Sequence, residues 1–447
     1  MSGGAWTVAA VAGVTAAYAL GSRRLAPTPI SSAIVFTGCG ILLGPAVLDL
    51  VSLGPDAEPI MVLLEAALTL VLFTDAMTVR RRDLTSGGFL PRRLLGIGLL
   101  LSIVAGWLLA WPLLPGLTMW ELALLGVILA PTDAALGKSA MSDPRVPGLV
   151  RQGLNVESGL NDGMVLPFFV VVLAAIPGTS YAAEGAAGTF WRALVLSTVL
   201  GLLVGGIGGR LLGAARARGW VTKEWGQVYV LAVAVASYEL AVVVDGSGFI
   251  AAWVAGFAFG HALRHAPAVP SLPDGERRGE RAGRDETPEF AENLGGLLAS
   301  ISLLLFGAVL LGPTLEHLTW RIVVYALLSL TVVRMVPVAL SLLGSGLRAP
   351  TVAYIGWFGP RGLASVVLGL LMVEEHVPGT ELMGRVVAVT VALSVLLHGV
   401  SAPAFAERYG RWYRRAAETA PEGLRESKTV PEMTGRRRLG RLDKPAD

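Results

Sequence analysis

The stretch ALVLSTVLGLLVGG at Ala193–Gly206 contains no charged residue, and LASVVLGLLMV at Leu363–Val373 is of the same kind. Such blocks, together with their less apolar flanks, recur along the chain at membrane-spanning length, about 20 residues. Hydrophobic residues make up 53% of the 447 residues and charged residues only 15%, whereas a water-soluble domain carries about a quarter charged residues. The composition therefore predicts an all-α polytopic membrane protein. It excludes soluble enzymes and nucleic-acid-binding proteins, despite a pI near 9.1.

Apolar blocks bounded by proline, glycine and charge predict about thirteen transmembrane helices. The first block lacks a basic leader, so we interpret it as a retained helix and not as a signal sequence. We expect a membrane domain over residues 1–408, with a polar cytoplasmic loop at 265–289, and a basic cytoplasmic tail over 409–447. The thirteen spans are expected near 4–20, 28–51, 57–77, 93–113, 117–141, 148–176, 188–212, 224–244, 247–264, 290–312, 318–344, 351–374 and 384–407.

Lysine and arginine concentrate in every second predicted loop, which indicates the orientation because cytoplasmic loops retain these residues. The chain has 36 of them, and the exceptions to the alternation are Arg192, Arg321, Arg385, Arg334 and Arg361. We therefore expect a multi-pass protein of the cell membrane, with the N-terminus outside and the C-terminus in the cytoplasm.

An odd span between two sets of six predicts an inverted repeat, in which spans one to six correspond to spans eight to thirteen. The fifth span contains Ala-Pro-Thr-Asp at 130–133, and its partner, the twelfth, contains Gly-Pro-Arg-Gly at 359–362. Helices broken at corresponding places indicate a binding site near the middle of the membrane. We expect the two broken helices to cross there.

An ionisable side chain inside a membrane indicates a structural or functional role, because inserting it costs about 2.5 to 3.5 kcal/mol on insertion scales. The densest polar group is Asn155-Val-Glu-Ser-Gly-Leu-Asn-Asp-Gly163 in the sixth span. Helical spacing places Asn161, Asp162 and Ser158 where their oxygens can surround a monovalent cation. Thr132 and Asp133 at the break in span five could complete the shell. The alternatives are an interhelical hydrogen-bond network and, for Asp133, a cap on freed amides.

A lone carboxylate at Asp162 can hold a cation or a proton in turn, and this alternation makes exchange obligatory because the empty charged site is costly to move. We expect Asp162, Thr132 and Ser158 to bind Na⁺ or K⁺. Since residue 161 is asparagine and not a second acid, one cation exchanges for one proton, and transport is expected to be electroneutral. No cofactor is expected.

Other membrane-embedded charges have more than one interpretation. Glu157 needs a basic partner, for which Arg334 is the first candidate and Arg361 the second. Glu65 in span three either approaches the ion site or lies apart from it. Asp75 is expected to pair with Arg80–Arg82 at the surface.

These motifs resemble the monovalent cation:proton antiporters of NhaP and animal sodium/proton exchanger type. The resemblance rests on Pro-Thr-Asp at 131–133, Glu-Ser-Gly-Leu-Asn-Asp at 157–162, the helix of Arg334 and Gly-Pro-Arg-Gly at 359–362. It implies that Asp162 binds the ion and the proton, that Asn161 is its partner, and that Glu157 pairs with Arg334. It also implies a homodimer that works by alternating access.

Two alternatives to a sodium/proton or potassium/proton antiporter stay open. A potassium efflux antiporter or gated channel would be favoured by a nucleotide-binding domain, but the tail contains no GxGxxG motif. An intramembrane hydrolase could use Glu157 and Asp162 as acid and base, although no paired histidines or activated nucleophile accompany them.

Overall fold

The structure is a computed structural model that describes residues 2–25, 28–51, 58–79, 89–133, 136–137, 141, 143–183, 188, 191–266, 289–420 and 423–427. These residues form helices joined by turns, and no strand occurs among them. Most of the predicted polar loop at 265–289 and of the basic tail lies outside the described residues.

The helices fall on all thirteen of the expected ranges, so the prediction of an all-helical polytopic membrane protein is confirmed. Within the described residues, eight helical stretches are long and apolar enough to cross a membrane. The first half comprises α1 (Ser2–Leu25), α2 (Ser32–Leu43), α3 (Glu58–Thr78), α5 (Phe89–Arg93) with the π-helical turn η1 (Leu94–Gly98) and α6 (Leu99–Leu113), α7 (Met119–Ile128), α9 (Gly148–Ala175) and the short α10 (Ser180–Ala183).

The seventh span and the second half follow in the same order. They comprise η2 (Arg192–Leu196) with α12 (Ser197–Ala217), α13 (Lys223–Val242), α14 (Gly248–Arg264), α16 (Glu289–Leu305) with η3 (Phe306–Leu311) and α17 (Gly312–Glu316), α18 (Trp320–Leu330) with α19 (Val332–Ser341), α20 (Ala349–Trp357), α21 (Leu363–Glu374), α22 (Thr380–Thr419) and the turn η4 (Arg425–Ser427). The predicted boundary between membrane domain and tail at 408/409 falls inside α22.

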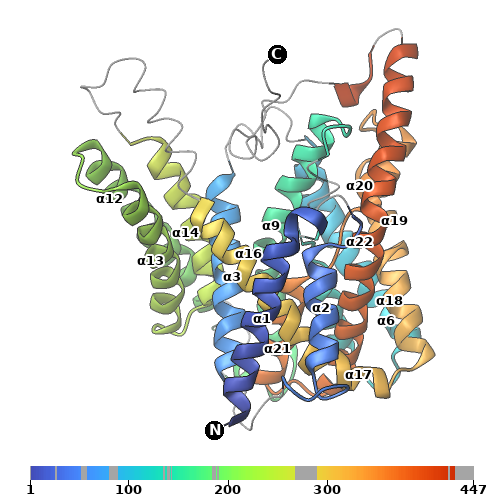
Figure 1. Cartoon of the computed structure of the whole chain (residues 1–447), viewed down its shortest axis with the longest axis horizontal. Coiled ribbons are helices and arrows are strands. Elements are labelled where there is room, and N and C mark those ends of the chain that lie inside the picture. Colours follow the sequence, from blue (N-terminus) through green and yellow to red (C-terminus); the bar gives the residue numbers. More distant parts are fainter. Residues whose placement is uncertain are drawn as a thin grey trace.

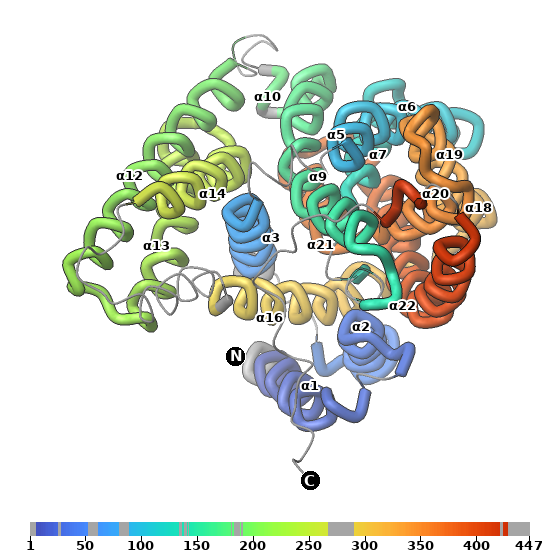
Figure 2. The backbone as a smooth tube through the Cα atoms, turned by 90° about the horizontal axis from the view of Figure 1, so that it is seen from above, coloured from blue at the N-terminus to red at the C-terminus, as the bar shows by residue number. Residues whose placement is uncertain are grey.

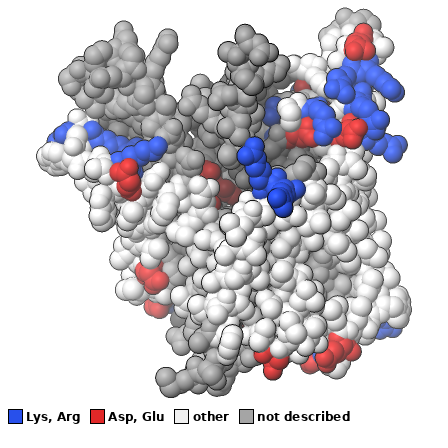
Figure 3. All heavy atoms as spheres, viewed as in Figure 1, with Lys and Arg blue, Asp and Glu red and all other residues white. Residues whose placement is uncertain are grey.

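Successive spans run in opposite directions, and α1 begins at the end of the molecule opposite to the one where α22 finishes (Figure 1). Lysine and arginine side chains gather at the end where α22 finishes, and a broad uncharged band lies below them (Figure 3). This band is the surface that a polytopic protein presents to lipid.

The helices form two parts that are visible from above (Figure 2). One part contains α1–α3, α12–α14 and α16, and the other contains α5–α9 and α18–α22. Contacts within the first part follow the expected inverted repeat, since α2 packs on α16 and the corresponding α14 packs on α3. In the second part, α6 packs on α7 and α19 packs on α20 in the same relation.

Glycines allow the close approach of α12 and α14. A Cβ atom on Gly205 would overlap the backbone of Ala255, and one on Gly209 would overlap the backbone of Phe259. Small residues four apart are a common way for membrane helices to pack backbone against backbone. The seventh span is thereby fixed to the first part of the molecule.

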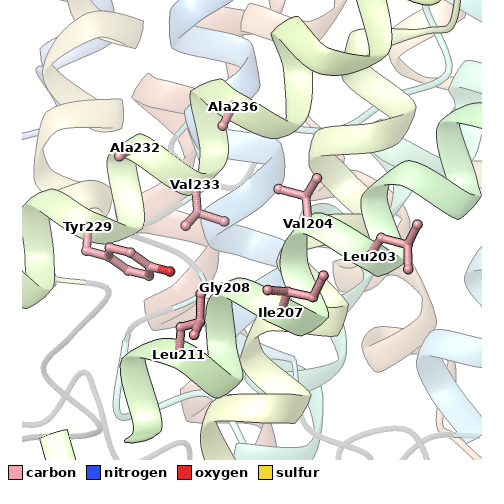
Figure 4. A pocket seen from close by; sticks show the side chains of 9 residues that line it. All are labelled: Leu203, Val204, Ile207, Gly208, Leu211, Tyr229, Ala232, Val233 and Ala236. Atoms are coloured by element: carbon pink, nitrogen blue, oxygen red, sulfur yellow. The ribbon is translucent and has the colours of Figure 1, made fainter. Parts of the chain in front are cut away.

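An outward groove of about 410 Å³ lies between α12 and α13, on this same part (Figure 4). The hydroxyl of Tyr229 is the one polar side-chain group among its lining residues. The lining residues are Leu203, Val204, Ile207, Gly208, Leu211, Tyr229, Ala232, Val233 and Ala236.

Candidate functional site: two crossed helix breaks and a buried carboxylate

The breaks in the fifth and twelfth spans are bonded to each other. α7 ends at Ile128, and the chain between α20 and α21 is non-helical at 358–362. The backbone N–H of Asp133 donates to the carbonyl of Pro360 at 2.7 Å. In the other direction, the backbone N–H of Leu363 donates to Oδ2 of Asp133 at 3.1 Å. Each break thus satisfies polar backbone groups that the other leaves free.

Arg361 supplies the positive charge at the crossing. Its side chain is fully buried, and its NH1 donates to the carbonyls of Ala130 at 2.7 Å and Pro131 at 3.0 Å. Ser365 donates to the carbonyl of Ile128 at 2.8 Å. Carbonyls at the C-terminal end of a helix carry partial negative charge, which a cation stabilises. Arg361 therefore lies in the break of the twelfth span and stabilises the carbonyls at the break of the fifth.

The polar group of α9 packs against the break in span five. Ser158 donates its hydroxyl to the carbonyl of Thr132 at 2.5 Å. The amide of Asn161 donates to Oγ1 of Thr132, also at 2.5 Å. Both side chains of α9 and Thr132 are buried. The sixth span and the break of the fifth thus form one polar cluster.

Glu157 is paired with Arg334 in a buried, two-pronged ion pair. NH1 of Arg334 donates to Oε1 at 2.8 Å and NH2 donates to Oε2 at 2.9 Å. Both side chains are 3% exposed. Asn161 adds a longer contact from its amide to Oε1 of Glu157 at 3.5 Å. A pair with both prongs satisfied is the form in which such charges are tolerated inside a protein.

Asp162 lies beside this cluster, and one of its carboxylate oxygens has no hydrogen-bond partner among the described residues. Its side chain is 9% exposed, and the buried Oδ1 atoms of Asp162 and Asn161 have no hydrogen-bond partner among the described residues. Asp133, Asp75 and Glu157 are close enough to act on Asp162 electrostatically, and Arg361 opposes them. Two buried oxygens without donors, on neighbouring residues and one of them a carboxylate oxygen, fit a cation or a proton. Within the described part of the chain, no three His, Cys, Asp or Glu side chains are grouped to hold a metal ion.

Two acids of α3 occupy different environments. Glu65 is half-buried and interacts with Tyr238 of α13, with Glu374 and Glu239 nearby. Asp75 lies against α9, where a Cβ atom on Gly159 would be 3.3 Å from the Cβ atom of Asp75. The arginines expected to pair with Asp75, at 80–82, lie outside the described residues.

Sequence reasoning missed a second set of bonds that fixes the twelfth span. His398 of α22 is buried, with its Nε2 2.9 Å from the carbonyl oxygen of Trp357 and its Nδ1 3.0 Å from that of Ser394. Either ring nitrogen can donate to its carbonyl, depending on the tautomer. Ser394 also accepts the backbone N–H of Arg361 at 2.6 Å. The spacing of Ser394 and His398, four residues apart on one helix face, was the available signal.

Crossed broken helices around a buried carboxylate are an arrangement typical of ion-coupled secondary transporters. A family model described as "Sodium/hydrogen exchanger, transmembrane" matches residues 9–408. The chain belongs to the sodium/hydrogen exchanger family.

Relatives and solved structures agree with this assignment. The K(+)/H(+) antiporter NhaP of Alkalimonas amylolytica is 25% identical over 307 residues, which cover 67% of this chain and 48% of that protein. The Na(+)/H(+) antiporter 2 of Zygosaccharomyces rouxii is 25% identical over 303 residues, covering 62% of this chain and 35% of that protein. The chain thus spans about half the length, or less, of these relatives.

The fold is similar to that of the sodium proton antiporter MjNhaP1 from Methanocaldococcus jannaschii, solved at pH 8. The TM-score is 0.69 at 20% sequence identity, and the match covers 92% of this chain and 99% of that one. At this identity the similarity establishes the fold.

Proposed function

We propose that this protein is a secondary-active antiporter that exchanges a monovalent cation for a proton, with Asp162 as the group that binds both. The observation that carries the proposal is the buried Oδ1 of Asp162, which has no hydrogen-bond partner among the described residues, beside the equally unpaired Oδ1 of Asn161. The relatives are named for Na⁺/H⁺ and K⁺/H⁺ antiport, which supports either cation as substrate.

Exchange follows from the charge of the site. With a cation or a proton bound, Asp162 is neutralised, whereas the empty carboxylate is a bare charge at low dielectric. Moving the site across the barrier empty is therefore much costlier than moving it loaded. Because Asn161 is uncharged and Glu157 is bound by Arg334, one carboxylate turns over per cycle. One cation for one proton transfers no net charge.

Thr132 and Ser158 would complete the cation shell. Their hydroxyls lie between α9 and the break of span five, bonded to Asn161 and to the carbonyl of Thr132. A hydroxyl that donates one hydrogen bond keeps lone pairs for a cation. Asp133 would hold the crossing through its bonds to Pro360 and Leu363, and would add negative charge near Asp162.

The setting of the transporter is part of the proposal. We place it in the cell membrane with the basic end in the cytoplasm, because positively charged loops are retained there. The N-terminus is then outside and the C-terminus inside. We place it further as a homodimer that works by alternating access, in which the part containing the crossing moves against the part containing α12 and α14.

The test is transport by purified protein in liposomes with an internal pH dye, given pulses of Na⁺, Li⁺ or K⁺. At least one cation is expected to move protons, with little change when the voltage is clamped to zero. Asp162→Asn is expected to reduce the signal to that of empty liposomes. The matched control is Asp245→Asn, which removes the same charge at an exposed position whose φ of 56° suits asparagine. Full activity of Asp162→Asn would place the exchange site elsewhere.

A further inference from the structure

A buried glutamate of the C-terminal segment lies far from the ion site and plays no part in the mechanism above. Glu426 belongs to the short turn η4 and is 1% exposed. Its Oε1 accepts the backbone N–H of Arg348 at 2.9 Å and the hydroxyl of Thr351 at 2.8 Å. A buried carboxylate on a three-residue turn needs such partners to be tolerated.

These partners are the first turn of α20, the basic-end half of the broken twelfth span. The side chain of Arg348, at the N-cap position, makes no capping hydrogen bond, and a proline follows within the first two helical positions. Free N–H groups and the positive end of the helix dipole favour a carboxylate at this place. Glu426 thus caps α20 from a position 78 residues further along the chain.

The turn has further contacts, all in one part of the molecule. The guanidinium of Arg425 lies 4.5 Å from the ring centre of Phe89 in α5. The hydroxyls of Tyr413 and Ser427 are 2.9 Å apart, and η4 also packs against α9. α5, α9, α20 and α22 all belong to the part that contains the crossing, so the turn does not bridge the two parts. A contact that restrained the relative motion of the two parts would have to bridge them.

α20 connects this cap to the ion site within a single helix of nine residues. At the far end, Pro360 accepts the backbone N–H of Asp133. Gly359 lies against Arg334, since a Cβ atom there would overlap the guanidinium. The position of α20 therefore sets where the break meets both Asp133 and the partner of Glu157.

We propose that Glu426 is a positioning residue, and that the docked turn Arg425–Ser427 holds α20 in the register in which the crossing binds its cation. The inference rests on the proposed function for its transport readout. Undocking the turn lowers the apparent affinity for the cation and does not release a brake.

The first experiment measures docking without transport. Hydrogen–deuterium exchange of the purified full-length protein reports the peptide that covers the start of α20. Glu426→Ala is expected to raise exchange there by about tenfold, because two hydrogen bonds to a buried carboxylate are lost. Glu426→Gln keeps an acceptor oxygen and is expected to lie between. Glu418→Ala, the same change at an exposed position of α22 outside the turn, is the control and is expected to behave as the parent.

The second experiment measures transport as a function of cation concentration. Glu426→Ala is expected to raise the half-saturating concentration by about three- to tenfold and to change the maximal rate less than about twofold. Glu426→Gln is expected to recover part of the affinity. Arg425→Ala loosens the turn without removing the cap, so it is expected to raise the half-saturating concentration by a smaller factor. This variant replaces Glu426→Ala in the test if Glu426→Ala does not fold.

Each outcome decides the proposal. Unchanged exchange at α20 in Glu426→Ala would overturn the docking. A raised maximal rate would show that the turn restrains transport. An unchanged half-saturating concentration together with raised hydrogen exchange would show that Glu426 is a purely structural cap. Either result contradicts the proposal. If the parent protein transports no cation, the proposed function fails, while the exchange experiment still decides whether Glu426 holds α20.

Discussion

Gly362 lies directly against the carboxylate of Asp133, so closely that a Cβ atom on this glycine would overlap Oδ2. The same oxygen accepts the backbone N–H of Leu363 at 3.1 Å. The two breaks can approach to this distance because residue 362 has no side chain. A glycine at the N-cap of α21 thus decides how tightly the two spans cross.

Gly362→Ala is expected to separate the two breaks. Overpacking at a tight contact costs about 1–3 kcal/mol, and the displaced carboxylate loses its bond to Leu363. We expect a lower melting temperature in detergent and loss of most transport in liposomes. Gly296→Ala is the control, because a Cβ atom there meets nothing within 4 Å. Equal behaviour of the two variants would contradict the contact.

The Glu157–Arg334 pair is expected to show strong energetic coupling. Glu157→Met or Arg334→Met alone leaves a buried charge without its partner, which costs about 3–5 kcal/mol. The double variant leaves no such charge and should be more stable than the sum of the single changes predicts. Unfolding in denaturant measures the four proteins of the cycle.

The exposed pair of Glu381 and Arg385 in α22 provides the reference cycle. Pairs at the surface contribute about 0–1 kcal/mol. A coupling energy for Glu157 and Arg334 no larger than that of this pair would show that the buried contact is not formed.

Thr132 is expected to affect cation binding through its hydroxyl. Thr132→Val removes the acceptor of the Asn161 amide, and one buried hydrogen bond contributes about 0.5–1.5 kcal/mol. The cation concentration for half-maximal proton movement should therefore rise by about two- to tenfold. Thr132→Ser keeps the hydroxyl and should stay near the parent value. Indistinguishable concentrations for Val and Ser would remove Thr132 from the site.

Asp143, in the loop before α9, is expected to give a small pH-dependent stabilisation. The side chain of Arg145 donates to both carboxylate oxygens, at 3.0 and 2.7 Å, and lowers the pKa of Asp143 below its usual value. The unfolded chain has the ordinary pKa, about 3.9. The stabilisation is therefore complete above that pH and is lost as the pH falls through the lower, folded pKa.

Asp143→Asn should accordingly lower the melting temperature at pH 7 by only about one to two degrees, since the pair is partly exposed and screened by solvent. The difference from the parent should shrink as the pH is lowered towards 3. A difference that grows on acidification would contradict the sign of the pKa shift.

The spans could be predicted from sequence because a bilayer admits only long apolar helices, which charge and proline delimit clearly. Hydropathy marks where a helix leaves the membrane and not where it ends. The last span, expected at 384–407, continues as α22 to Thr419, because its polar extension remains helical in water. The polar motif Asn155–Gly163 identified the candidate ion site, since few residues of that kind occur inside spans.

Contacts between distant segments could not be predicted. The bond between Asp133 and Pro360 joins residues more than 200 positions apart, and it depends on how the two breaks face each other. For the same reason the sequence left Arg334 and Arg361 as alternative partners of Glu157. Packing gives the two arginines different partners. Arg334 pairs with Glu157, whereas Arg361 donates to the carbonyls of Ala130 and Pro131.

The reciprocal bonds between the two breaks limit what can move. Sliding one half-helix along the other would expose the N–H of Asp133 or of Leu363 without an acceptor, in a place where water cannot replace it freely. The crossing and α9, which is bonded to it through Thr132, therefore form one rigid unit. In the proposed exchange, a path for the cation from either side of the membrane would have to open at the outer boundary of this unit, where α9 packs against α3 and α14, and not inside it.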